Sequence, residues 1–280
     1  MKTRILTALI ALPIVIASII LPIWYKQTIW IFVALAAFAL AAGLFEFYSL
    51  TKKLELKADA AIGYLGAAAL FVGFVFDAPA KAPEWLIATV ALFVIVVLIS
   101  QTFRFKADFS KMLTGVGVTI VGVMYVAFLG GFLVSIRTGF ESTPNLSTHL
   151  LGYFFMVIFG SDVGAYFAGR AFGKHKLAPA ISPGKTVEGL IGGILTAAVT
   201  AAAATYLFFP ELPYQWSIPL AVVLAVVGVL GDLAESAMKR GSKTKDAASI
   251  LPGHGGLLDR LDSLLFGAPI LYYFARFYFS

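Results

Sequence analysis

A polar segment near the C-terminus of this 280-residue sequence gathers residue types that bind divalent cations and phosphate. Asp259 and Asp262 are spaced to share one helix face, and a histidine lies among the glycines of 253–256. Mg²⁺ prefers carboxylate oxygens, and it usually takes one or two of them together with substrate phosphates. Glycine lets backbone N–H groups approach an anion, and lysine and arginine supply charge that faces phosphate. The candidates here and in the helix end before this segment are Asp232, Lys239, Arg240, Lys245, His254, Gly255, Gly256, Asp259, Arg260 and Asp262. We therefore hypothesise a site for Mg²⁺ and phosphate, with a solvated loop as the alternative.

A second candidate phosphate site begins at Ser182. Its Gly-Lys-Thr run at 184–186 resembles part of a Walker A loop, but the position of that motif's first glycine holds proline, and no soluble βαβ unit surrounds it. We instead predict a helix start, with Ser182 as the N-cap and Pro183 as the first helical residue. A helix N-terminus with an adjacent lysine is a natural phosphate site. Ser182, Lys185 and Thr186 are therefore predicted to bind phosphate.

The composition indicates that these segments belong to a membrane protein. The chain is 60% hydrophobic and only 13% charged, whereas soluble domains carry about 25% charged residues. This excludes a soluble enzyme, and it excludes disorder, which needs low hydrophobicity. There is no cysteine, which excludes disulfides, zinc–cysteine sites and thiol catalysis. In a membrane protein the net charge of +6 is no sign of nucleic-acid binding, because the placement of the charges matters more than their sum.

Long apolar runs predict an all-α integral membrane protein with about nine transmembrane helices. A spanning helix needs roughly 20 mostly apolar residues. The predicted spans are 5–24, 28–50, 60–76, 84–103, 113–134, 150–170, 187–209, 216–236 and 262–279. The first is longer than the apolar part of a signal peptide, so we predict that it is retained. We expect residues 1–150 to form about five scaffold helices that also offer a dimer contact. Residues 151–280 are expected to form the catalytic region, with a polar loop at 237–261.

The positive charges predict the orientation of these spans. Seventeen of the 21 lysines and arginines fall at the N-terminus or in alternate connections, which places them on one side of the membrane. Cytoplasmic loops carry the excess of lysine and arginine. We therefore predict a cytoplasmic N-terminus and an outer C-terminus.

Five acidic residues intrude into the spans, where carboxylates are costly and mark candidate functional sites. They are Glu46, Asp162, Glu188, Asp232 and Glu235. All five lie toward the predicted cytoplasmic side, which indicates an active site that opens to that side. For Glu46, snorkelling or pairing with Lys52 or Lys53 stays open. Glu188 is also explained as an acid at a helix N-terminus. Helical spacing places Asp232 and Glu235 on one polar stripe with three later residues, Ser236, Lys239 and Arg240.

The C-terminal motif resembles the signature of the phosphatidate cytidylyltransferases, the CDP-diacylglycerol synthases. The similarity covers 27 residues, in the runs Ser236–Arg240, Lys245–Asp246, Pro252–Gly256 and Asp259–Asp262. Two further stretches that resemble family positions are 161–166 and 182–189. The first half of the chain carries little of the resemblance beyond its hydropathy.

This resemblance implies that CTP and phosphatidate react to give CDP-diacylglycerol and pyrophosphate, in phospholipid biosynthesis and with dependence on Mg²⁺. It also implies a homodimer in the bacterial cytoplasmic (inner) membrane. The expected catalytic residues are Asp232, Asp259, Lys239, Arg240, Lys245, His254 and Arg260. The residues expected to bind CTP are Ser182, Lys185, Thr186, Gly255 and Gly256. The expected metal ligands are Asp232 and Asp259, with Asp262 or Asp162 as a further ligand, and a second cation stays an option.

Two other classes of protein compete with this interpretation. Acids inside spans are also found in secondary transporters and ion channels, but here the acids gather toward one side and no internal repeat is evident. A CTP-dependent polyprenol kinase would also need a cytoplasmic phosphate site. Only the resemblance of the C-terminal motif argues against the kinase.

Overall fold

The computed structural model describes residues 2–77, 84–104, 109–140, 144–242 and 255–279. The helices in these ranges are α1 (Lys2–Ile20), α2 (Ile29–Lys53), α3 (Ala60–Phe76), α4 (Glu84–Arg104), α5 (Met112–Gly122), α6 (Leu129–Gly139), α7 (Leu146–Phe172), α8 (Val187–Leu207), α9 (Tyr214–Gly241) and α10 (Leu258–Phe279). A π-helical turn, Val123–Phe128, joins α5 and α6 into one continuous helix. Short 3-10 turns at Leu21–Ile23 and Lys26–Thr28 connect α1 to α2.

The nine predicted spans each coincide with a helix of the described chain, so the prediction of a multi-span helical protein is confirmed. Within the described ranges, six helices are long and apolar enough to cross a membrane on their own: 26–53, 84–104, 112–139, 146–172, 187–207 and 214–241. The prediction of purely helical structure misses one element. A small antiparallel hairpin, β1 (Lys176–Ala178) and β2 (Ser182–Thr186), connects α7 to α8.

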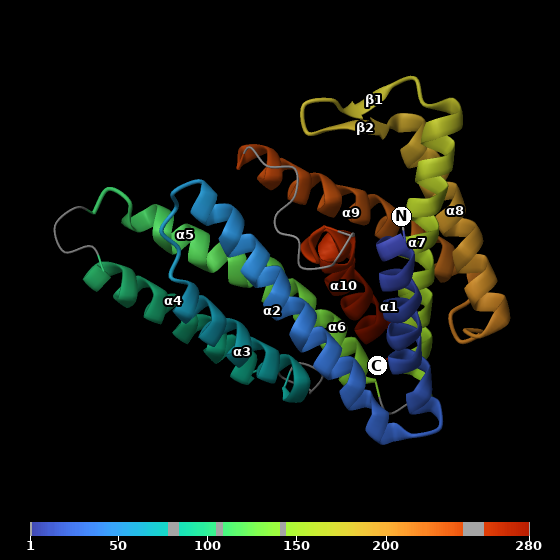
Figure 1. Cartoon of the computed structure of the whole chain (residues 1–280). Coiled ribbons are helices and arrows are strands. Elements are labelled where there is room, and N and C mark those ends of the chain that lie inside the picture. The colour runs from blue at the N-terminus through green and yellow to red at the C-terminus, as the bar shows by residue number, and fades with distance from the viewer. Residues whose placement is uncertain (1, 78–83, 105–108, 141–143, 243–254, 280) are drawn as a thin grey trace.

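The helices alternate in direction, as the charge pattern requires. Helices α2, α4, α7 and α9 finish toward one end of the bundle, and α1, α3, α6 and α8 finish toward the other (Figure 1). Of the seventeen clustered positive charges, those that lie within the described residues belong to the first end. The assignment of that end to the cytoplasm stays a prediction.

The arrangement places α10 at the centre of the molecule. In Figure 1, α7 and α8 run side by side, α2 to α6 form the other part of the bundle, and α9 and α10 lie between them. The main apolar core joins these parts, because it includes buried residues of α6, α7 and α10 such as Ile136, Leu150 and Leu271. Helix α10 therefore links the two parts.

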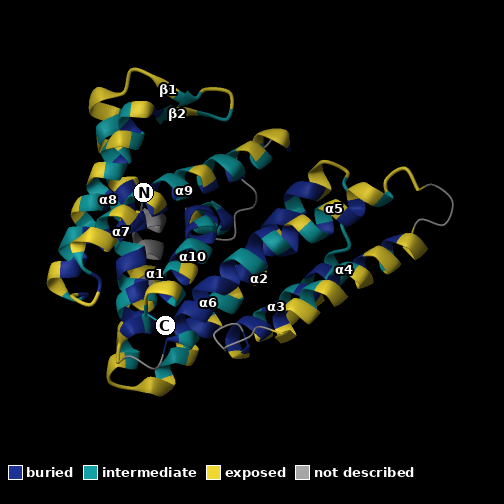
Figure 2. Cartoon of the chain, turned by 180° about the vertical axis from the view of Figure 1, so that it is seen from behind, coloured by how far each residue is buried: buried dark blue, intermediate teal, exposed yellow. Residues whose placement is uncertain are grey.

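The outward sides of the bundle are apolar. Trp85, Leu113 and Phe277 are each more than three-quarters exposed. Figure 2 shows exposed residues along the outward sides of α4 and α8, and mostly buried residues on α2 and α6. Soluble proteins rarely expose so much contiguous apolar surface. These faces fit contact with lipid, as expected for a multi-pass membrane protein.

Candidate active site

A cavity of about 640 Å³ lies where α7, the hairpin, α8, α9 and α10 meet. Its charged lining residues are Asp162, Arg170, Lys185, Asp232, Asp259, Arg260 and Asp262. Six of these seven were predicted from the sequence to bind metal or phosphate, and they come from four separate segments of the chain: α7, β2, α9 and α10. With Thr186, the structure therefore brings seven of the fourteen predicted site residues together in one cavity.

Close packing of α9 against α10 explains how two of the acids come to share this cavity. A Cβ atom at Gly231 would lie 2.5 Å from the backbone oxygen of Asp262, so a side chain there would push the helices apart. The hydroxyl of Ser263 donates to the backbone oxygen of Gly228 at 3.1 Å, which joins the helices one turn further along. As a result, Asp232 on α9 and Asp262 on α10 both line the cavity.

Replacing Gly231 by alanine is expected to impair both stability and function. The added methyl must displace α10, and overpacking of this kind costs about 1–3 kcal/mol. Gly241→Ala on the same helix is the matched control, because a Cβ atom there meets nothing within 4 Å. We expect a lower thermal unfolding midpoint and lower turnover for Gly231→Ala only. Equal behaviour of the two variants would contradict the close approach.

Two lysines make short ion pairs with the candidate metal ligands. The Nζ atom of Lys185 lies 2.6 Å from Oδ2 of Asp232. The Nζ atom of Lys239 lies 2.5 Å from Oδ1 of Asp259 and 2.6 Å from Oε2 of Glu235. Glu235 and Lys239 are four residues apart on α9, so the polar stripe predicted from helical spacing is present. Both lysine side chains are at most about one-fifth exposed, which strengthens these electrostatic contacts.

The remaining acids lie close to these pairs. Asp162 interacts electrostatically with Asp232, Lys185 and Arg260. Asp262 interacts with Asp232 and Asp162, and its own Oδ1 accepts a hydrogen bond from the backbone N–H of Ser263 at 2.6 Å. Among the described residues, no group of three acidic or histidine side chains is already arranged around one metal position. The cavity therefore mixes carboxylates and cations, which suits a ligand that carries both phosphates and a metal ion.

The start of α8 corrects one prediction about the second phosphate segment. Thr186, not Ser182, caps the helix: its backbone is extended, and its side-chain oxygen accepts a hydrogen bond from the N–H of Gly189 at 3.1 Å. Ser182 instead pairs with Ala178 in the hairpin, and Pro183 lies within β2 rather than at the first helical position. Lys185 and Thr186 still line the cavity at the end of β2.

Side chains from both neighbouring helices hold this hairpin in place. Glu188 in the first turn of α8 accepts hydrogen bonds from the backbone N–H groups of Lys174 and His175, and its Oε1 lies 2.6 Å from Nδ1 of His175. The Nε atom of Arg240, at the end of α9, donates to the backbone oxygen of Ile181 at 3.1 Å. Arg240 was predicted to be catalytic, but in the structure its guanidinium contacts the hairpin backbone and does not line the cavity.

Comparison with known proteins identifies the family. A sequence profile of the cytidylyltransferase family matches residues 2–278. The chain belongs to the cytidylyltransferase family. It is 36% identical to a phosphatidate cytidylyltransferase of Bacillus subtilis over 284 residues, which cover 98% of this chain and 97% of the relative. It is 34% identical to a phosphatidate cytidylyltransferase of Staphylococcus haemolyticus, with 97% of each chain covered. A relative of the same name from Haemophilus influenzae is 43% identical over 55% of this chain and 54% of the relative.

The lining of the cavity includes polar side chains that were not predicted as site residues. Arg170 and Tyr166 line the cavity from α7, and Nη1 of Arg170 donates to the tyrosine hydroxyl at 3.1 Å. Tyr166 follows Asp162 by four residues and Arg170 follows it by eight. At this helical spacing the three side chains share one face of α7. That spacing is the signal that would have identified them.

Glu46 is the most consequential residue that the sequence interpretation left open. It lies in α2, far from the motif, and it is fully buried rather than snorkelling to Lys52 or Lys53. Its carboxylate accepts hydrogen bonds from the backbone N–H groups of Leu257 at 2.8 Å and Leu258 at 2.7 Å. These N–H groups begin α10, so a side chain of the first half of the chain caps the helix that carries Asp259.

Several predicted residues do not line the cavity or cannot be placed. Lys245 and His254 lie outside the described residues. Gly255 has a φ of 81°, in the left-handed region that favours glycine, and Gly256 packs against the carboxylate of Glu46. These two glycines lie where the chain enters α10. The first residue of this segment that lines the cavity is Asp259.

Proposed function

We propose that this family member transfers the cytidylyl group of CTP to phosphatidate, which gives CDP-diacylglycerol and pyrophosphate. The observation that carries the proposal is the cavity in which Lys185, Arg260 and four aspartates meet at the lysine- and arginine-rich end of a membrane bundle. The relatives that match nearly the full length are named for this activity.

The reaction needs little covalent chemistry from the protein. A phosphate oxygen of phosphatidate attacks the α-phosphorus of CTP, the bond to the β-phosphate oxygen breaks, and pyrophosphate leaves. The phosphate monoester is already anionic near neutral pH, so no general base is required. The protein contributes by positioning the reactants and by stabilising the negative charge that develops.

The cationic side chains are assigned to the phosphates. Lys185, Arg260 and Arg170 point their charge into or around one cavity, and Lys185 stands beside the N-terminus of α8, where the helix dipole favours anions. Thr186, the N-cap residue of α8, lines the same cavity. Lys239 is held between Glu235 and Asp259, where it orients the carboxylate. Ser182, Arg240, Lys245 and His254 are proposed to shape or bind the phosphate-facing loops around this core.

The carboxylates fit a magnesium ion. Asp232 and Asp259 are the proposed ligands, with Asp262 or Asp162 as a further ligand, and a second cation is compatible with four acids in one cavity. Asp232 and Asp259 each face a lysine ammonium, at 2.6 and 2.5 Å, so carboxylate oxygens in this cavity already bind positive charge. When bound, Mg²⁺ supplies charge neutralisation of the phosphates.

Removal of divalent cations is expected to abolish lipid product formation. With excess EDTA the purified protein should form no CDP-diacylglycerol, and added Mg²⁺ should restore the rate. The measurement is product mass per unit time, with thermal unfolding recorded in parallel to show that the fold persists. Undiminished turnover in EDTA would contradict the metal assignment.

The membrane context explains how two unlike substrates meet. The α7 helix exposes Val163, Tyr166 and Phe167 beside the cavity, each more than half exposed. A lipid can reach the cavity along this apolar side while CTP arrives from water at the charged end. We place the site at the cytoplasmic side of a bacterial cytoplasmic membrane. Residues 151–280 supply the reacting groups, and residues 1–150 supply the scaffold and a contact of the proposed homodimer.

The direct test supplies the purified protein with CTP, Mg²⁺ and phosphatidate. We expect equal amounts of CDP-diacylglycerol by mass spectrometry and of pyrophosphate in solution, with neither product when phosphatidate is omitted. A transporter would form neither. A polyprenol kinase would also form neither, but in a parallel reaction with an isoprenoid alcohol it would give CDP and the phosphorylated alcohol. Either outcome would overturn the proposal.

A further inference from the structure

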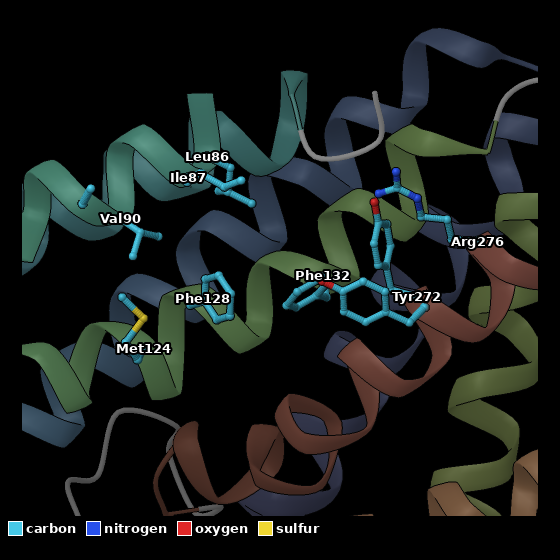
Figure 3. Close-up of a pocket in the computed structure, with 10 residues that line it drawn as sticks. Leu86, Ile87, Val90, Met124, Phe128, Phe132, Tyr272 and Arg276 are labelled. Carbon is cyan, nitrogen blue, oxygen red and sulfur yellow. The ribbon is translucent and has the colours of Figure 1, made fainter. Parts of the chain in front are cut away.

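A second pocket lies at the opposite end of the bundle from the charged cavity. It has a volume of about 470 Å³, within the range of ligand pockets, and it is open to one side between α4 and α10 (Figure 3). Its lining is apolar except at one end: Leu86, Ile87, Val90, Ala91, Met124, Phe128, Phe132, Tyr272, Tyr273 and Arg276.

This pocket is separate from the proposed active site. Arg276 follows Asp259 by 17 residues on the same helix, α10. At 1.5 Å per residue, this corresponds to roughly 25 Å along the helix axis. A molecule in the pocket therefore does not contact the reacting groups.

The four tryptophans of the sequence indicate where this end lies in the membrane. Trp24, Trp30, Trp85 and Trp216 all stand in or beside the connections at this end, and each is about half exposed or more. Tryptophan is enriched at the level of the lipid headgroups. Trp85 directly precedes Leu86 of the pocket lining. The polar end of the pocket is therefore near the headgroups, and its apolar part faces the hydrocarbon.

The polar end combines an arginine with tyrosine hydroxyls. Figure 3 shows Arg276 and Tyr272 at one end of the row of apolar side chains, and Tyr273 also lines the pocket. Tyr272 is buried, and its hydroxyl interacts with the Arg276 guanidinium. A guanidinium carries five N–H donors in a planar fork that matches phosphate. The remaining lining, from Ile87 to Phe128, offers no polar side chain and suits a hydrocarbon chain.

We propose that this pocket binds one anionic phospholipid, with an acyl chain against α4 and the π-helical turn and the phosphate at Arg276. The charge of Arg276 selects an anionic headgroup over a zwitterionic one, because only the anionic lipid brings uncompensated negative charge. The site is independent of the cytidylyl transfer, so the two proposals fail separately.

The test uses the full chain in detergent with phospholipids that carry a photoreactive diazirine in one acyl chain. Phosphatidylglycerol is the anionic probe and phosphatidylcholine the zwitterionic one. For the unmodified chain we expect phosphatidylglycerol adducts concentrated at residues 86–91 and 124–132, located by mass spectrometry. Arg276→Gln should lower this labelling at least fivefold without changing that of phosphatidylcholine. Val90→Trp fills the pocket and should lower both.

Two further variants keep the test decisive. Lys26→Gln removes an exposed positive charge from the same end of the bundle, at a residue outside the pocket. Phosphatidylglycerol labelling of this variant should match that of the unmodified chain. Arg276→Lys keeps the charge and should retain most of the phosphatidylglycerol labelling. Labelling spread evenly over the lipid-facing helices, or unchanged labelling in Arg276→Gln and Val90→Trp, would overturn the proposal. Cross-links to a second copy of the chain at these residues would also overturn it, in favour of a protein interface.

Discussion

Asp232→Asn and Asp259→Asn are each expected to lower turnover by at least about 10²–10³-fold, the cost of removing one preorganised group at a reacting centre. Asparagine keeps the size of the side chain but removes the negative charge that binds a cation. Both residues line the cavity, and each holds a lysine at 2.5–2.6 Å. The measurement is the initial rate of CDP-diacylglycerol formation with saturating CTP and phosphatidate.

The fold should survive both substitutions. Asp232 is 39% exposed, and the hydrogen bond that it accepts from Ser236 at 3.2 Å can be kept by an amide oxygen. Glu55→Gln is the matched control, because it removes an exposed acid from the connection between α2 and α3, outside the cavity. Lys53→Ala, at the end of α2, should likewise change turnover little. Substantial activity in both aspartate variants would contradict their assignment as metal ligands.

Glu46→Ala is the second large effect that we expect, and it acts through stability. The substitution leaves the backbone N–H groups of Leu257 and Leu258 without their acceptor. An unsatisfied buried donor costs about 1–3 kcal/mol, so the loss of the acceptor for two donors should lower the free energy of unfolding by about 2–6 kcal/mol. The start of α10 would shift with it, and Asp259 lies one residue later. We therefore expect turnover to fall together with the thermal unfolding midpoint.

Glu46→Gln separates the loss of the acceptor from the loss of charge. The amide keeps one oxygen acceptor, so this variant should be less destabilised than Glu46→Ala. Ser49→Ala on the same helix is the control, because Ser49 is outside the buried core and its hydroxyl donates to the backbone of Phe45 within its own helix. If Glu46→Ala unfolds at the same midpoint as Ser49→Ala, Glu46 does not hold α10 in place.

The helices and much of the charged cavity could be predicted because their signals are local. Apolar length predicts a span, and positions three or four residues apart share a helix face. The pair between Glu235 and Lys239 follows from this spacing alone. The convergence of Asp162, Asp232 and Asp262 on one cavity follows from their shared depth at one end of alternating spans.

The features that were missed depend on distant contacts or on very short elements. The partner of Glu46 lies 211 residues away, and no local pattern indicates it. The strands of the hairpin have three and five residues, too short for a clear alternation of polar and apolar side chains. Ser182 followed by proline fits a helix start equally well. The N-cap residue, Thr186, is recognised only from the structure, because β2 keeps the chain extended up to Thr186 and α8 begins at the next residue.

Parallel reactions with CTP labelled at the α- or the γ-phosphate test the central claim most directly. If phosphatidate attacks the α-phosphorus in this cavity, the lipid product carries the α-label and the γ-label leaves with pyrophosphate. The same experiment with Asp232→Asn should leave both labels out of the lipid. Transfer of the γ-label to lipid, or an undiminished α-label in Asp232→Asn, would contradict the proposed reaction or its place in the structure.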